Sequence, residues 1–270
     1  MTLLIGQDTE LFLKKNDKFI SAHGVIPGSK EQPYPVKRGA VQVDGMALEF
    51  NTFPAKSFTA FKMNINTVLS RLQDMIPDDC EMTVCPTAHF DAKYIEDQPE
   101  EARLLGCDPD YNAYTKEMNL PPTPSPVMRT AAGHIHLGWT EGKNINDPSH
   151  MHDCITMVKQ LDYCIGVPSV IHDSDTERRQ MYGQAGAFRP KSYGVEYRVL
   201  SNYWISHENY MKEVFDNCKK AYEDLERGKI WEDVFKGHSI YSAQKVINSG
   251  DVGKAITIMD VMKLKKVRGQ

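Results

Sequence analysis

The stretch that decides the fold is Gly186-Ala-Phe-Arg-Pro-Lys-Ser-Tyr-Gly-Val-Glu-Tyr-Arg-Val-Leu200. Its second half alternates apolar and charged residues, and a period of two residues is typical of a strand. Glu196 and Arg198 therefore share the polar face of an otherwise apolar strand. A surface ion pair is one interpretation. The other is that Glu196 holds a cation while Arg198 holds an anion beside it.

A second strand is predicted at the start of the chain, over Leu3–Leu13. Asp8 and Glu10 lie two residues apart in it, so both point to the same face. Two like charges placed in this way repel each other unless a cation lies between them. An exposed strand face would also explain the pair, and either interpretation fits this segment alone.

A third strand is predicted within Val41–Asn51, after a turn or bulge at Asp44-Gly45. Glu49 is the acid of this apolar segment, and a solvated edge strand is again the alternative. The fourth strand lies within Arg129–Trp139 and carries His134 and His136 on one face. Such a pair is a candidate for metal binding because neutral imidazole is a common ligand, although a buried histidine is often only a core residue.

Taken together, these strands offer mainly oxygen ligands with one or two imidazoles. Such a set suits Mg²⁺ or Mn²⁺ better than zinc. Arg189 lies seven residues before Glu196, and arginine beside a metal site suits phosphate because its planar fork matches phosphate oxygens. The residues alone therefore predict a site for divalent metal and nucleotide phosphate on one face of a sheet.

The order of the motifs is Gly-x-Asp-x-Glu, Leu-Glu-Phe-Asn, Gly-His-x-His-x-Gly, Phe-Arg and Glu-x-Arg. This order resembles the glutamine synthetase-like carboxylate–amine ligases, a superfamily that includes the glutamate–cysteine ligases. The nearest similarity is to the compact phage-type carboxylate–amine ligases, and it also draws on Gly106–Tyr114 and Arg178–Arg189. It covers roughly residues 3–204.

The resemblance implies an ATP-dependent ligase in which ATP phosphorylates a carboxylate and an amine then displaces phosphate. Two Mg²⁺ or Mn²⁺ ions would assist. The substrates would be small molecules or peptides. The first strand departs from the family's usual Glu-x-Glu, and we identify neither an ammonia-preparing loop nor a separate small N-terminal domain. The resemblance assigns metal binding to Asp8, Glu10, Glu49, His134 and Glu196, catalysis to Arg189 and Arg198, and nucleotide binding to His136, Arg178 and Arg179, the last two being explained equally by a solvated loop.

Bulk properties are those of an ordinary globular chain of 270 residues with 41% hydrophobic and 25% charged residues. The net charge of −4 argues against a general nucleic-acid binder. We find no apolar run long enough to span a bilayer and no signal peptide, so we expect no membrane partner. Six scattered cysteines favour free thiols in a reducing cytoplasm, which would be the host cytoplasm for a phage protein.

The expected fold is α+β, with a curved, mainly antiparallel sheet, helices on one face and a likeness to the glutamine synthetase catalytic domain. We expect a ligase-like core over residues 1–204 and a helical part over 205–270, packed together as one domain. Residues 91–128 are expected to form an elaborated loop, either a lid or a structural wrap. Helices are predicted from Ser57 to Pro77, near 148–165, along 210–225, and in two pieces split by Ser249-Gly250-Asp251, with a loop from Pro168 to Gly186.

Two other functions fit parts of the pattern. A metal hydrolase would bind zinc through His134 and His136, although zinc hydrolases usually use more histidine or cysteine ligands. A non-catalytic nucleotide-binding protein of the same fold would keep the charged residues without turnover. Tightly held zinc would favour the hydrolase, whereas weakly held Mg²⁺ or Mn²⁺ would favour the ligase.

Overall fold

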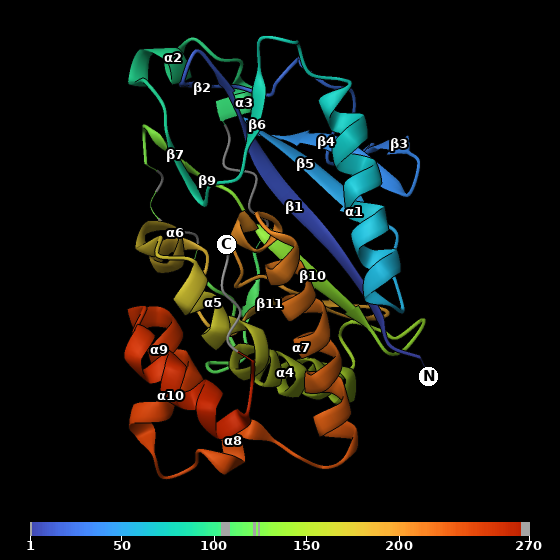
Figure 1. Cartoon of the computed structure of the whole chain (residues 1–270), viewed down its shortest axis with the longest axis vertical. Helices are drawn as coiled ribbons and strands as arrows, with labels where there is room; N and C mark the ends of the chain where they lie inside the picture. Colours follow the sequence, from blue (N-terminus) through green and yellow to red (C-terminus); the bar gives the residue numbers. More distant parts are fainter. Residues whose placement is uncertain (1, 104–108, 121–122, 124, 266–270) are drawn as a thin grey trace.

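Figure 1 shows a computed structural model of the chain, which describes residues 2–103, 109–120, 123 and 125–265. Parts of two sequence predictions fall outside these residues. They are the start of the Gly106–Tyr114 stretch used for the resemblance and several positions of the 91–128 segment.

The main sheet has ten strands, and every described pairing in it is antiparallel. Its order is β3-β4-β5-β1-β10-β12-β11-β8, and β2 and β6 also pair with β1. A separate two-stranded sheet joins β7 to β9. The bounds are β1 Leu4–Lys15, β2 Lys18–Ile20, β3 Tyr34–Val36, β4 Gly39–Asp44, β5 Ala47–Thr52, β6 Glu81–Thr83, β7 Thr87–His89, β8 Tyr111–Asn112, β9 Met128–Thr130, β10 Gly133–Gly138, β11 Ala187–Lys191 and β12 Gly194–Tyr197.

The two faces of this sheet differ in chemistry. Strand residues such as Ile135 and Tyr197 are fully buried in a core to which helices contribute Phe61 and Phe215. The charged residues of the same strands point to the other face, as side-chain alternation requires. The predicted α+β fold with an antiparallel sheet and helices packed on it is therefore confirmed.

Helix α1 (Phe58–Gln73) begins where the sequence predicts. The Ser57 side chain accepts a hydrogen bond from the Ala60 amide at 3.3 Å, which satisfies one of the free amides of the first turn. Phe61, Ile65 and Val68 form its buried stripe. Helix α7 (Glu208–Glu226) packs beside α1, and the two lie close together in Figure 1.

The helix predicted near 148–165 continues further than expected. Helix α4 (Pro148–Leu161) passes into a π-helical turn, Asp162–Gly166, and then into α5 (Val167–His172). The loop predicted from Pro168 onward is therefore wrong in its first part. Pro168 lies in the first turn of α5, directly after the π-helical turn, and does not end the helical run.

The remaining helices are short. Helix α6 (Thr176–Met181) also interrupts the predicted loop, and its Asp175 N-cap accepts from the Arg178 amide at 3.1 Å. The two predicted tail helices are α9 (Ala243–Ser249) and α10 (Val252–Met262), with Asp251 as the expected cap. No helix among the described residues is both long and apolar enough to cross a membrane. The other helices are α2 Ala92–Glu96, α3 Glu100–Arg103, α8 Trp231–Val234 and the 3₁₀ turns η2 Asn202–Ile205 and η3 Ser239–Tyr241.

Candidate functional site

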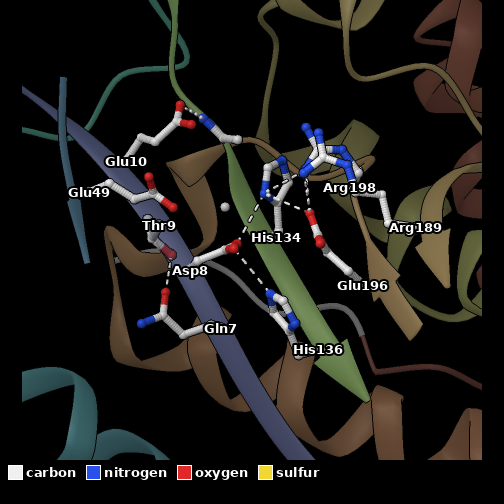
Figure 2. A network of polar contacts seen from close by, with 12 residues as sticks. Gln7, Asp8, Thr9, Glu10, Glu49, His134, His136, Arg189, Glu196 and Arg198 are labelled. Carbon is white, nitrogen blue, oxygen red and sulfur yellow. Dashed lines mark hydrogen bonds and ion pairs between the residues drawn. The ribbon is translucent and has the colours of Figure 1, made fainter. Parts of the chain in front are cut away.

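Strand register brings the predicted residues together on the open face of the sheet (Figure 2). Asp8 on β1 lies opposite His134 on β10, and Glu10 lies opposite Glu49 on β5. On the far side of β10, His136 lies opposite Glu196 of β12. Segments separated by up to 188 positions in sequence thus meet because three neighbouring pairings place their polar residues at adjacent levels of the sheet.

Asp8, His134 and Glu196 form the centre of the site. His134 Nδ1 lies 3.0 Å from Asp8 Oδ1 and 3.7 Å from Glu196 Oε1. One ligand atom from each of the three residues lies within 4.8 Å of the others, which is the spacing around a single metal ion. Burial, followed by the charge of Arg198, lowers the pKa of His134 to about 4. The imidazole is therefore neutral near pH 7, as a metal ligand must be.

Asp8 also contacts His136, whose Nε2 lies 3.1 Å from Asp8 Oδ2. Burial favours the protonated acid, but the charges of His136 and His134 outweigh it and hold the pKa of Asp8 well below its usual range. The other ring nitrogen of His136 lies 2.5 Å from the Tyr193 hydroxyl. Asp8 therefore joins the two histidines, and Tyr193 fixes the ring of His136 from the other side.

A second group of acids lies on the other side of Asp8. Burial, and then the charge of Asp44, raises the pKa of Glu10 to about 7. Burial and the charges of Asp8 and Glu10 raise the pKa of Glu49 well above its usual value. Gln42 Nε2 donates to Glu49 at 2.6 Å and the Ala132 amide donates to Glu10 at 2.7 Å, so both acids are held in place. Crowded carboxylates of this kind are the environment that a divalent cation neutralises.

Cations surround Glu196 on its remaining sides. Arg198 donates to Glu196 Oε1, the guanidinium of Arg189 lies 3.5 Å from the same oxygen, and Lys191 Nζ lies 2.7 Å from Oε2. Arg198 also donates from Nε to Asp110 at 3.0 Å. Although burial and Asp8 oppose ionisation, His134 and Arg198 lower the pKa of Glu196 to about 2. The part of the site around Glu196 is thus rich in positive charge, whereas the part around Glu10 and Glu49 is rich in acids.

The two remaining predicted arginines behave differently. Arg178 is buried and donates to the main-chain oxygens of Val199 at 2.9 Å and Arg198 at 3.3 Å. Arg179 is also buried but donates to the Asp173 main chain at 3.0 Å, away from the acids. The structure therefore does not bring Arg179 to the site, and a solvated loop explains neither residue. Arg178 supports the backbone that carries Arg198, and its charge lowers the pKa of Glu10.

Sequence reasoning did not assign Asp44, Asp110 or Lys191 to the site. Lys191 had a usable signal, because it lies two residues after Arg189 and shares its strand face. Asp44 was explained by the turn that it begins, and that turn is present, since Gly45 has a φ of 56°. Asp110 comes from the 91–128 segment, and no local pattern connects it with Arg198.

A pocket opens on each side of Asp8. The first lies beside Glu10 and Asp44 and is lined by the buried arginines 129, 178 and 198. The second includes Asp8, His136 and Tyr193, and its described lining residues include no lysine or arginine. Two of its lining residues, Gly6 and Gly138, carry no side chain. One pocket thus suits an anionic group, and the other suits a neutral or apolar group next to the acids.

This geometry can be compared with known proteins. Residues 125–235 match a family model described as Phage phiEco32-like COOH.NH2 ligase-type 2. The resemblance to phage-type carboxylate–amine ligases is therefore confirmed for this segment. The matched segment contains His134, His136, Arg189, Glu196 and Arg198, but it begins after the acids of β1 and β5.

Solved structures give a looser likeness. They include a glutamine synthase homolog (10% identity, 96% of this chain and 67% of that chain), a bifunctional glutathione synthetase from Pasteurella multocida (10%, 97% and 49%) and GmaS in complex with ADP (12%, 96% and 64%). Each has a TM-score of 0.40. The chain spans about half to two thirds of the length of these structures. No curated protein matches the chain.

Proposed function

We propose that the protein is an ATP-dependent ligase that joins a carboxylate to an amine through an acyl phosphate. One observation carries the proposal: acids crowd together on one side of Asp8, while a histidine, two arginines and a lysine surround Glu196 on the other. Phosphoryl transfer needs this combination, because negative charge must be both positioned and neutralised. The match of residues 125–235 to a ligase family supports the same reaction class.

The donor set fits two divalent ions with mainly oxygen ligands. Asp8, His134 and Glu196 would hold one ion, and Glu10 with Glu49 would hold the other. The raised pKa values of Glu10 and Glu49 support the second position, because both acids lack a sufficient positive partner among the described residues. When bound, Mg²⁺ or Mn²⁺ would neutralise phosphate charge and orient the transferring group.

The two pockets suggest where the substrates bind. We place the nucleoside of ATP in the pocket with His136 and Tyr193, because Asp8, His136 and Glu141 are the only ionisable side chains besides Tyr193 among its described lining residues. His136 is then close to the phosphates. The carboxylate substrate would enter the arginine-lined pocket beside Glu10. The two substrates would meet over Asp8, between the two acid groups.

In the first step, a carboxylate oxygen attacks the γ-phosphorus and the bond to the β-phosphate oxygen breaks, which releases ADP. Arg189, Lys191 and Arg198 would stabilise the negative charge on the transferred group. In the second step, the amine attacks the acyl carbon, loses a proton and expels phosphate, which leaves an amide. Holding both substrates against one rigid sheet supplies the alignment that these steps need.

The alternatives fit the site less well. A zinc hydrolase would need nitrogen or sulfur ligands, but the described group of possible ligands has two carboxylates and one imidazole. His136 interacts with the far oxygen of Asp8 instead of joining that group. A non-catalytic nucleotide-binding protein would not need Glu49 to be buried among other acids. The raised pKa of Glu49 indicates that this burial is unfavourable for its charged form.

Release of phosphate from ATP tests this function. Purified protein is incubated with ATP, Mg²⁺ or Mn²⁺ and pools of amino acids and short peptides, and phosphate and ADP are measured. We expect turnover that depends on both the metal and an organic carboxylate. Tight copurification of zinc together with metal-dependent hydrolysis of peptides or esters, but not ATP, would instead support the hydrolase.

A further inference from the structure

The residue Asp162 is a carboxylate buried in the core behind the site. It begins the π-helical turn Asp162–Gly166 and has no exposed surface. Burying a carboxylate costs free energy, and short π-helical turns are often found at functional sites. Nothing in the proposed chemistry touches Asp162, so its presence in the core calls for a separate explanation.

The first partner of Asp162 is a residue of the catalytic strand. The Tyr197 hydroxyl donates to Asp162 Oδ1 at 2.7 Å, and Tyr197 is fully buried. Tyr197 lies between Glu196 and Arg198 and pairs across β10 with Ile135, the residue between the two site histidines. It is therefore placed directly behind the centre of the site.

The approach of Tyr197 to the π-helical turn depends on a glycine. A Cβ atom at Gly166 would lie 2.5 Å from the Tyr197 hydroxyl, so a side chain there would push the tyrosine away. The turn thus provides both the acceptor, Asp162, and the space that the hydroxyl needs.

The second partner comes from the loop that follows β8. The Tyr114 hydroxyl and Asp162 Oδ2 are both buried, and neither has a hydrogen-bond partner of standard geometry among the described residues. Burial raises the pKa of Asp162 to about 7, and the nearby hydroxyls of Tyr197 and Tyr114 oppose this rise. The same segment carries Asp110 just before β8, which accepts from Arg198 at 3.0 Å, and Asn112 at the end of β8, whose side chain accepts from the Tyr114 amide at 2.9 Å.

We propose that Asp162 is a positioning residue that links strand β12 and the Asp110–Tyr114 segment to the helical layer. Through Tyr197 it fixes the position of Glu196 and Arg198 relative to the helical layer. Through Tyr114 it places Asp110 against Arg198. The expected effect on kcat rests on the proposed function, but the expected structural link between the two segments does not. The buried carboxylate has a role here that an apolar residue cannot perform, because one oxygen accepts from Tyr197 while the other is buried close to the Tyr114 hydroxyl of a separate segment.

The test removes one hydroxyl at a time. Tyr197→Phe is compared with Tyr163→Phe. Tyr163 is also buried and follows Asp162 in the π-helical turn, but its hydroxyl donates to the Tyr241 main-chain oxygen at 3.5 Å. We expect Tyr197→Phe to lower kcat roughly 10-fold with KM for ATP changed less than about 2-fold, because misalignment weakens transition-state contacts most. Tyr163→Phe should keep the wild-type kcat.

Hydrogen exchange of the intact protein gives a readout that needs no activity. Tyr197→Phe, Tyr114→Phe and Asp162→Asn should each speed amide exchange in both residues 194–199 and residues 109–119, whereas Tyr163→Phe should speed neither. Coupled exchange in the two segments supports the proposal even if the wild type fails to consume ATP, a result that would count against the ligase function alone. Exchange that is unchanged, confined to the mutated segment or equal in Tyr163→Phe would overturn it.

Discussion

At the residue scale, the account depends on a few charged side chains whose pKa values only make sense together. Glu196 is an acid with three cationic neighbours, and Glu49 is an acid among acids. Strand alternation alone predicts which of these residues share a face. It does not predict how strongly they interact, because the pKa values depend on burial and on neighbours from other strands.

Removing the charges around Glu196 should stop turnover without unfolding the protein. Glu196→Gln and Arg198→Ala are each expected to lower ATP consumption by about 100-fold or more, since the first removes a proposed metal ligand and the second removes a cation facing the transferred phosphate. Glu223→Gln and Arg227→Ala serve as controls because this pair is exposed at the end of α7. Circular dichroism would verify the fold, and normal ADP release from either site variant would count heavily against the assignment.

The pKa of Glu10 gives a prediction on pH and stability. Burial and Asp44 raise this pKa from its ordinary value of 4.5 to about 7. Between these values the folded protein holds a proton that the unfolded chain releases, so the free energy of unfolding falls as pH rises through this window. Without metal, the wild type should lose on the order of 1–3 kcal/mol from pH 5 to pH 8 through this group.

Glu10→Gln isolates this effect, because it has no charge to bury. Thermal melts of metal-free protein should show the variant more stable than the wild type at pH 8, with a smaller difference at pH 5. Added Mn²⁺ should stabilise the wild type more than the variant, which keeps only the position formed by Asp8, His134 and Glu196. An identical pH dependence for both proteins would mean that Glu10 does not titrate as described.

At the scale of elements, the strands that carry the motifs could be predicted from the sequence, and so could α1 with its Ser57 cap. The joins between elements could not. Pro168 indicated the end of a helix but lies in the first turn of α5, and Asp110 reaches Arg198 from a loop with no periodic pattern. Both features depend on contacts between segments that are distant in sequence, which local propensity does not report.

The β4–β5 hairpin provides a test at this scale. Gly45 has a φ of 56°, where a side chain is disfavoured, and the hairpin places Asp44 and Glu49 next to Glu10. Gly45→Ala should cost about 1 kcal/mol and also weaken Mn²⁺ binding. Gly228→Ala, at a φ of 73° with open space around it, should have a similar cost and leave Mn²⁺ binding unchanged. Equal Mn²⁺ affinity in both variants would show that the hairpin conformation does not affect the metal site.

At the scale of the whole molecule, we propose that residues 1–204 and 205–270 form one domain. Phe215 of α7 is buried 5.3 Å from the ring of Phe61 on α1, and one hydrophobic cluster runs from Ile5 to Leu264. The helices of the C-terminal part thus complete the layer that supports the sheet.

Phe215→Ala tests this unity. Deleting a buried aromatic ring typically costs about 3–5 kcal/mol, and here the loss should appear as a lower midpoint of one cooperative transition. Phe53→Ala is the control because its side chain is 61% exposed. Two separate transitions, with only the smaller one shifted, would show that the C-terminal helices unfold independently.

We propose that acids from β1, β5 and β12, together with His134 of β10, hold two divalent ions against a nucleotide. The most direct test of this claim is the stoichiometry of Mn²⁺ binding, measured by electron paramagnetic resonance in the presence of a non-hydrolysable ATP analogue. We predict two bound ions per chain in the wild type, and one in both Glu49→Gln and Glu196→Gln. A wild type that binds no Mn²⁺, or variants that bind as many ions as the wild type, would contradict the account.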